Sequence, residues 1–263
     1  WARAAAATDP ARLAERTTWW ERRLGSLPEE VTFPPDRARG KASGRGAGQV
    51  RAEIDAATQR GVTALAGRAG VSSFVVLHGV FAALLNLHGA GDDIVVGTVT
   101  AGRDSSALED VVGFFVNTVV LRSDLSGDPT FEELLARLKL SDADCLAHAD
   151  VAFDSVVERL NPDRSGGRHP LFQVMFTTQD HRREAVPGAL FDVARARNLV
   201  VGSKFDLTLT LEERRDGIGV VADYSRDLFD DETATAILHR YVLLAQRVVA
   251  DPSLRMHELR GHA

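Results

Sequence analysis

The side chain of greatest chemical interest is Asn117, which stands alone in an apolar run. Residues 111–122 read Val-Val-Gly-Phe-Phe-Val-Asn-Thr-Val-Val-Leu-Arg, a Gly-aromatic turn followed by an apolar strand. An amide is disfavoured in a strand by propensity, and a buried amide needs hydrogen-bond partners. Two interpretations stay open: Asn117 and its neighbour Thr118 bind a polar ligand, or Asn117 satisfies neighbouring backbone groups.

Three further sites carry groups that can do acid–base or nucleophilic chemistry. His148 is the best single candidate for a general base, although a lone histidine without an orienting partner is more often structural. Asp92 and Asp93 are adjacent at the entry to a strand. In that position two carboxylates more often cap a turn than bind a metal. Cys145 has no evident basic partner, so we expect a buried apolar side chain rather than a thiolate.

No self-contained catalytic centre is recognisable in the sequence. The chain lacks a Gly-x-Ser-x-Gly elbow, a Walker-type phosphate loop and a dinucleotide fingerprint. Its eight histidines show neither the i, i+4 spacing of a helical metal site nor a neighbouring cysteine pair, so no metal is expected.

Composition narrows the class of protein. The 263 residues are 44% hydrophobic and 26% charged, as in a globular domain. A net charge of −6 argues against a nucleic-acid binder. The single cysteine fits a reducing, cytoplasmic location, and no apolar run reaches the roughly 20 residues of a membrane span. The abundance of Ala and Arg suggests a bacterial source, and the first residue, Trp1, indicates a chain that begins inside a longer polypeptide.

Periodicity and capping signals predict a mixed α/β architecture. Helices are expected over 9–25, 56–68, 74–88, 131–146, 153–160 and 231–249, and strands over 49–54, 94–100, 171–177, 205–211 and 219–224. Residues 26–48 are predicted to be an extended crossover or a mobile linker, and 180–203 a long loop. Strands separated by helices favour a layered α/β sandwich.

Several segments, in order, resemble the condensation domains of non-ribosomal peptide synthetases. They are Trp20-Glu-Arg-Arg-Leu-Gly-Ser-Leu-Pro28, Gly91-Asp-Asp-Ile-Val-Val-Gly-Thr-Val-Thr-Ala-Gly-Arg103, Gly113-Phe-Phe-Val-Asn-Thr118, 148–158, His169-Pro-Leu-Phe-Gln-Val-Met-Phe176, Lys204-Phe-Asp-Leu-Thr-Leu209 and 224–230. The third segment is similar to the form found in peptide-bond-forming members, whereas epimerization domains carry Gly-Trp-Phe-Thr there. Ala152 and Val99 depart from the family, which usually has proline at both positions.

The resemblance implies a two-lobed fold in which each lobe is like chloramphenicol acetyltransferase and a tunnel runs between the lobes. The family's catalytic motif, His-His-x-x-x-Asp-Gly, belongs to the first lobe and is missing from this chain. Residues 1–48 would then be a helix plus the interlobe crossover, and residues 49–263 the C-terminal lobe. No catalytic residue is expected in this chain, and the fragment alone is expected to be inactive.

The resemblance also implies a binding site and partners. The tunnel would be lined by Arg103, Ser105, Gly113, Phe115, Asn117, Thr118 and Gln173. No cofactor would be bound directly, because the substrates arrive on the phosphopantetheine arms of donor and acceptor peptidyl carrier proteins. The other implied partners are the missing N-terminal lobe and adjacent synthetase domains, in antibiotic or siderophore biosynthesis. Two alternatives remain: a non-catalytic module that recruits carrier proteins or another enzyme, and a stand-alone acyltransferase acting on a soluble thioester.

Overall fold

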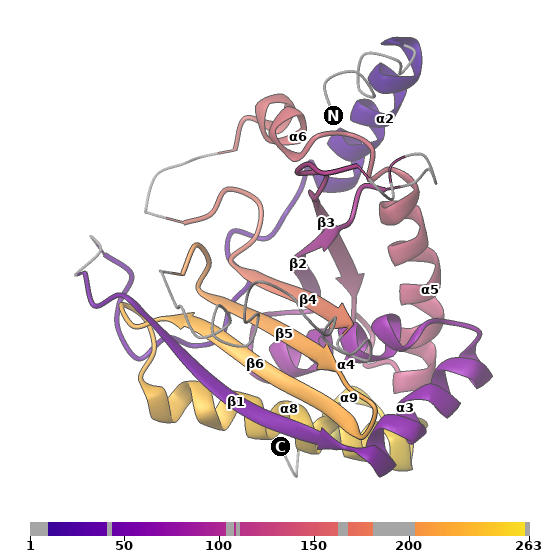
Figure 1. Cartoon of the computed structure of the whole chain (residues 1–263), viewed down its shortest axis with the longest axis vertical. Coiled ribbons are helices and arrows are strands. Elements are labelled where there is room, and N and C mark those ends of the chain that lie inside the picture. Colours follow the sequence, from indigo (N-terminus) through magenta and orange to yellow (C-terminus); the bar gives the residue numbers. More distant parts are fainter. Residues whose placement is uncertain are drawn as a thin grey trace.

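A mixed six-stranded sheet organises the protein (Figure 1). The computed structural model describes residues 10–40, 44–103, 108, 111–162, 168–180 and 203–260. The sheet order is β1-β6-β5-β4-β2-β3, with β4 parallel to both β5 and β2 and the other neighbours antiparallel. The strands are β1 (Ala47–Asp55), β2 (Asp93–Thr100), β3 (Asn117–Asp124), β4 (Val174–Asp180), β5 (Leu207–Glu213) and β6 (Gly217–Ser225).

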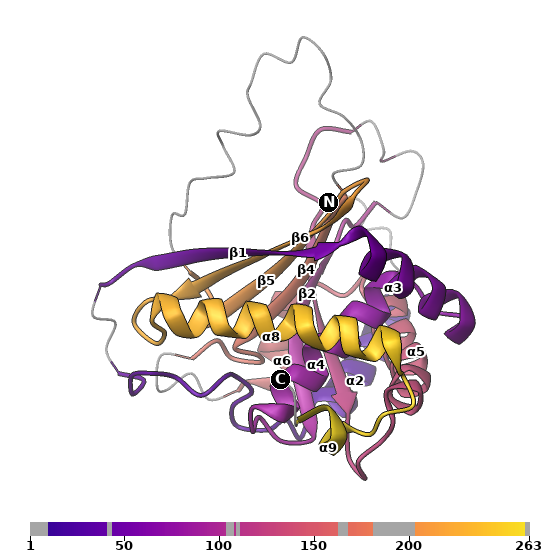
Figure 2. The ribbon, with the colours of Figure 1, turned by 90° about the horizontal axis from the view of Figure 1, so that it is seen from below.

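Helices complete the layered α/β architecture that the sequence predicts. They are α2 (Pro10–Leu24), α3 (Ala56–Ala69), α4 (Ser73–Leu87), α5 (Phe131–Ala147), α6 (Phe153–Leu160), α8 (Asp231–Ala250) and α9 (Met256–Leu259). Helices α3, α4 and α8 lie on one side of the sheet (Figure 2). The fully buried stretch 76–85 of α4 lies at the centre of the core, as its nearly continuous apolar sequence requires.

Local chemistry explains where the helices begin. The Asp55 side chain accepts from Thr58 N at 2.7 Å, and the Ser72 side chain accepts from Val75 N. Thr130 and Glu133 form a reciprocal capping box at the start of α5. Each of these side chains accepts a backbone hydrogen bond that the first turn of a helix otherwise leaves unmade.

The crossover after α2 packs against the sheet instead of spanning solvent. Val31 N donates to Gln173 Oε1 at 2.7 Å, and Arg39 Nη1 donates to Asp206 Oδ1 at 2.9 Å. Asp36 accepts from the backbone of Asp230 at the start of α8. The described part of 26–40 is therefore a docked crossover, while the boundary between lobes at residue 48 stays a prediction.

The predicted strand at 171–177 begins later than expected, and the predicted loop at 180–203 lies almost wholly outside the described residues. Strand β4 begins at Val174, and Gln173 just before it accepts from Val31 N of the crossover and from Asp206 N. Among the described residues no single helix is long and apolar enough to cross a membrane; α3 and α4 pass that test only as a pair bent by 103°.

Candidate functional site

Three of the residues singled out in the sequence meet where β2 ends and β3 begins. Thr100 pairs with Asn117 and Val99 with Thr118, so the segment after β2 and the segment before β3 emerge together. This places the turn at Arg103 beside Phe115, as the contact of their side chains shows. Arg103, Phe115 and Asn117 thus form a cluster at two adjacent strand ends, and Thr118 follows Asn117 on β3.

Phe115 is the centre of that cluster. The Arg103 guanidinium carbon lies 4.4 Å above the centre of the Phe115 ring, a cation–π contact. Gly102 has φ of 61°, and any side chain at Gly102 would collide with the Phe115 carbonyl oxygen. Arg103 also donates to Leu108 O. The turn after β2 is therefore locked onto Phe115, which is itself buried.

Asn117 uses its side chain within the protein. Its Nδ2 donates to Ala149 O and Val151 O, both at 2.7 Å, and its Oδ1 accepts from Phe153 N at 3.2 Å. These partners belong to the connection between α5 and α6 and to the first residue of α6. Of the two interpretations that the sequence left open, the structure therefore agrees with the one in which Asn117 satisfies neighbouring backbone groups.

The segment before Asn117 is exposed from Val111 to Phe114 and alternates between solvent and interior from Phe114 onward. Phe115 and Asn117 are 7% and 8% exposed, whereas Val112 and Phe114 are 100% and 83% exposed. Val116 and Val99 are also exposed large apolar side chains. A contiguous apolar surface of this kind marks an interaction site rather than a surface meant for water.

The remaining predicted site residues lie elsewhere or outside the description. Gly113 lies within the exposed segment, with Phe115 against its backbone. Thr118 lines a small nook with Trp20 and Phe153. The side chain of Gln173 is buried and bonded to Val31 N and His169 O, and Met175 pairs with Gly97, so Gln173 lies toward the start of β2. Ser105 lies outside the described residues.

The other candidates for chemistry are structural. The His148 ring stacks on Trp19 with ring centres 4.0 Å apart, and its Nδ1 bonds to Asp144 O. Asp92 accepts from Asn86 at 2.8 Å and closes the turn as predicted, but Asp93 belongs to β2 and pairs with Arg122 at 2.7 Å. The turn-cap interpretation is therefore wrong for Asp93, because a cross-strand arginine lies within its reach.

Cys145 is fully buried in α5, as expected. Burial raises the pKa of its thiol to about 11, so the thiol is protonated and unreactive at neutral pH. Among the described residues no group of three or more His, Cys, Asp or Glu side chains is placed to hold a metal ion.

Sequence analysis missed a buried polar triad. His78 Nδ1 lies 2.8 Å from Asp142 Oδ2, and Ser123 Oγ lies 3.5 Å from His78 Nε2. The three residues come from α4, α5 and β3, and no short sequence motif links them. Their order resembles a hydrolase triad, but all three side chains are buried and no substrate can reach them. The triad ties the two helices to the strand.

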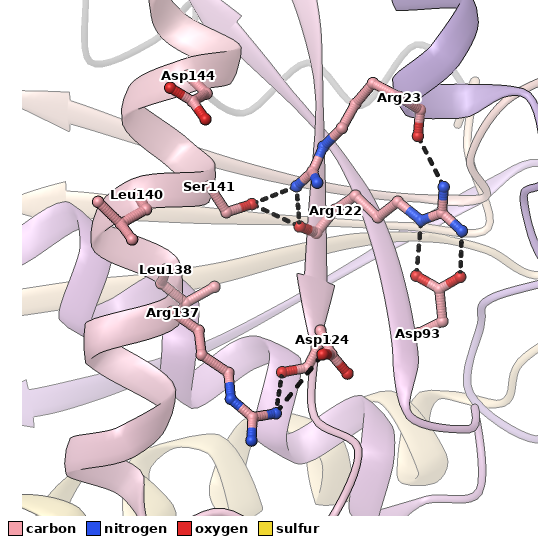
Figure 3. Close-up of a pocket in the computed structure, with 9 residues that line it drawn as sticks. All are labelled: Arg23, Asp93, Arg122, Asp124, Arg137, Leu138, Leu140, Ser141 and Asp144. Carbon is pink, nitrogen blue, oxygen red and sulfur yellow. Dashed lines mark hydrogen bonds and ion pairs between the residues drawn. The ribbon is translucent and has the colours of Figure 1, made fainter.

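A cavity of about 510 Å³ lies between α5 and the edge strand β3 (Figure 3). Its three arginines are already engaged: Arg122 pairs with Asp93, Arg137 donates to Asp124 O, and Arg23 donates to Arg122 O. Arg137 and Arg23 cap carbonyls along the free edge of β3, which protects the edge from pairing with another strand. The cavity is a protected sheet edge rather than a reaction site.

Comparisons with known proteins agree on one family. The model of the condensation domain matches residues 1–261. A protein of Salinispora arenicola named as the nonribosomal peptide synthetase CymA is 40% identical over 252 residues, 94% of this chain and 3% of that protein. The dimodular nonribosomal peptide synthase of Bacillus subtilis is 36% identical over 253 residues, 94% of this chain and 11% of that protein.

A solved structure gives the same result at the level of the fold. The complex of the X-domain and OxyB from teicoplanin biosynthesis matches with a TM-score of 0.84 and 32% identity, covering 94% of this chain and 55% of that chain. This chain therefore spans about half of the solved protein and a small part of the curated relatives.

Proposed function

The chain belongs to the condensation-domain family, and from that premise we propose that it is the C-terminal lobe of a peptide-bond-forming condensation domain. The proposal rests on the family match over nearly the whole chain together with the absence of the His-His-x-x-x-Asp-Gly motif from its sequence. In the proposed reaction, the amine carried by an acceptor attacks the thioester of a donor. A histidine on the missing lobe would orient or deprotonate that amine.

The observation that carries the role of this lobe is the apolar surface at the end of β2. Val112 and Phe114 are almost fully exposed, yet their segment is anchored by Phe115 and Asn117. An anchored, outward-facing apolar segment without an acid–base group suits a tunnel wall, which positions reactants without exchanging protons. This lobe would contribute positioning, while the other lobe contributes the base.

Within that wall the predicted site residues divide into two kinds. Arg103, Gly113 and Thr118 would form the wall itself, with Ser105 following Arg103 in sequence, and the buried Phe115 would anchor it. Asn117 and Gln173 would support it from behind, because the hydrogen-bonding groups of both amides are engaged with other parts of the protein. No cofactor would be held by the lobe, since phosphopantetheine arms of donor and acceptor carrier proteins would bring the substrates.

An amide-formation assay with two loaded carrier proteins tests this function. We would compare the 263-residue chain with the same chain extended upstream through the His-His-x-x-x-Asp-Gly motif. Product from the extended protein alone is the expected result. Product from the 263 residues by themselves would contradict the assignment, because it would require a catalytic base within this lobe.

One comparison favours a second candidate function. The similar X-domain was solved in a complex with OxyB, so a domain of this fold can bind another protein. An enzyme-recruiting module would bind its partner but form no amide even when the upstream segment is present. Absence of product from the extended protein, with the motif intact and both carriers loaded, would therefore favour this second candidate.

A further inference from the structure

Asn117 connects two segments that are far apart in sequence. Its two amide hydrogens go to Ala149 O and Val151 O, and its oxygen receives the Phe153 amide. Only one orientation of the amide fits, because the donor group must face two carbonyls and the acceptor must face an N–H. The side chain therefore has no hydrogen left to donate to a substrate.

The first of these segments is the loop Val111–Val116. Its inward anchors are Phe115, held by the turn at Gly102 and Arg103, and Asn117 itself. Its outward side chains include Val112 and Phe114. Phe115 and Asn117, two positions apart, set the direction of the backbone. That direction determines where the outward side chains point.

The second segment is the connection Ala149–Ala152 between α5 and α6. Helix α6 has no side-chain cap from its own N-cap residue, Ala152. The side chain of Asn117 supplies the acceptor for the first amide of the helix, Phe153 N. The position of the connection relative to the loop is thus set by one side chain.

We propose that Asn117 is a positioning residue for condensation: it fixes the loop Val111–Val116 against the α5–α6 connection and makes no contact with the thioester arm through its amide hydrogens. The proposal rests on the proposed function for its effect on rate, but the clamp itself is a statement about structure. Without the clamp, the loop and the connection move independently, and Val112 and Phe114 lose their fixed direction.

Ala152 offers a way to separate positioning from substrate binding. Its φ of −60° matches the angle that a proline ring imposes, and its N–H donates to no described residue. Ala152→Pro should therefore stiffen the connection without Asn117. If Asn117 acts through that connection, the proline compensates in part for its loss; if Asn117 contacted the substrate, the proline would change nothing.

The test compares four forms of the synthetase that carries the complete domain: parent, Asn117→Ala, Ala152→Pro and the double variant. Hydrogen exchange of amides and amide-formation kinetics are measured on each. We expect Asn117→Ala to speed exchange in both 149–153 and 112–116 and to lower kcat, by up to about 100-fold for a displaced wall. KM should change less than kcat, and the double variant should recover part of kcat and of the protection.

Faster exchange confined to 149–153, or unchanged in both segments, would overturn the clamp. A rise in KM with kcat intact, not relieved by Ala152→Pro, would show that Asn117 binds substrate. A parent without amide product would refute the proposed function, while exchange still decides the clamp.

Asn86→Ala is the matched control. Its amide also holds a loop, through Gly91 O at 2.9 Å and Asp92, but at the start of β2. It should leave kcat and exchange at 112–116 unchanged. If Asn117→Ala fails to fold, Asn117→Asp, which keeps the shape but lacks the donor group, replaces it in every comparison.

Discussion

At the residue scale, Cys145 gives the fold a pH dependence whose sign is fixed by burial. The thiol has an ordinary pKa of 9.0 in the unfolded chain and one raised to about 11 in the folded protein, first of all by desolvation. Between these two values the unfolded chain releases a proton that the folded chain keeps. The free energy of unfolding is therefore unaffected below pH 9 and falls as pH rises, by at most about 1.4 kcal/mol per pH unit.

Urea denaturation at several pH values from about 8 to about 11 measures this loss. Cys145→Ala should be less stable at pH 8, because it leaves a small void, but its stability should fall less steeply with pH. Tyr224, whose pKa burial raises to about 12, contributes equally to both proteins and cancels in the comparison. Parallel pH curves for the two proteins would contradict the assignment to Cys145.

At the element scale, the crossover is fastened to the sheet by a nearly buried ion pair. Both carboxylate oxygens of Asp206 accept from Arg39, and hydrogen bonding to Asp206 raises the pKa of Arg39. Arg39→Ala would leave the carboxylate of Asp206, only 8% exposed, without its cation. We expect a loss of about 2–3 kcal/mol, at or below the low end for buried pairs because Arg39 is partly solvated.

Two variants make this prediction specific to the pair. Asp206→Asn added to Arg39→Ala should restore much of the stability, because the uncompensated charge is removed. Arg37→Ala on the same crossover should cost no more than about 1 kcal/mol, since its partner Asp230 is exposed. Equal losses for Arg37→Ala and Arg39→Ala in chemical denaturation would show that burial of the partner does not matter here.

Also at this scale, the starts of helices could be predicted from the sequence, but the partners of Asn117 could not. Helix starts were predictable because Asp55, Ser72 and Thr130 cap helices through contacts only three residues away. The partners of Asn117 were not predictable, because they are backbone groups 32 to 36 residues distant and carry no residue signature. Asn117 itself was noticed because an amide contrasts with apolar neighbours.

The start of β4 and the buried triad could not be predicted from the sequence for the same reason. Leu171 to Gln173 alternate like a strand, but Gln173 bonds to the crossover, which is remote in sequence. His78, Ser123 and Asp142 come from three elements whose packing brings them together. Sequence predicted the elements, whereas Arg103 and Phe115 were singled out through the family resemblance; their neighbourhood with Asn117 depends on the pairing of β2 with β3, which no local pattern encodes.

At the scale of the whole molecule, the exposed apolar surface predicts how this chain behaves in isolation. Helices α3, α4 and α8 cover one side of the sheet (Figure 2), while Val112 and Phe114, just before the start of β3, are exposed to solvent. In the proposed complete domain this surface would face the missing lobe. Alone, the chain can hide it only by associating with another copy, so we expect sedimentation velocity to show concentration-dependent association.

Val112→Ser combined with Phe114→Ser should weaken that association. Fully burying either side chain stabilises a contact by about 1.5–3 kcal/mol, so removing both should raise the dissociation constant at least about tenfold. Leu243→Ser is the control: Leu243 is 50% exposed on α8, away from this surface, and its replacement should leave association unchanged. A monomer at all concentrations, or equal weakening by Leu243→Ser, would contradict the prediction, because either result would show that the loop is not the surface that associates.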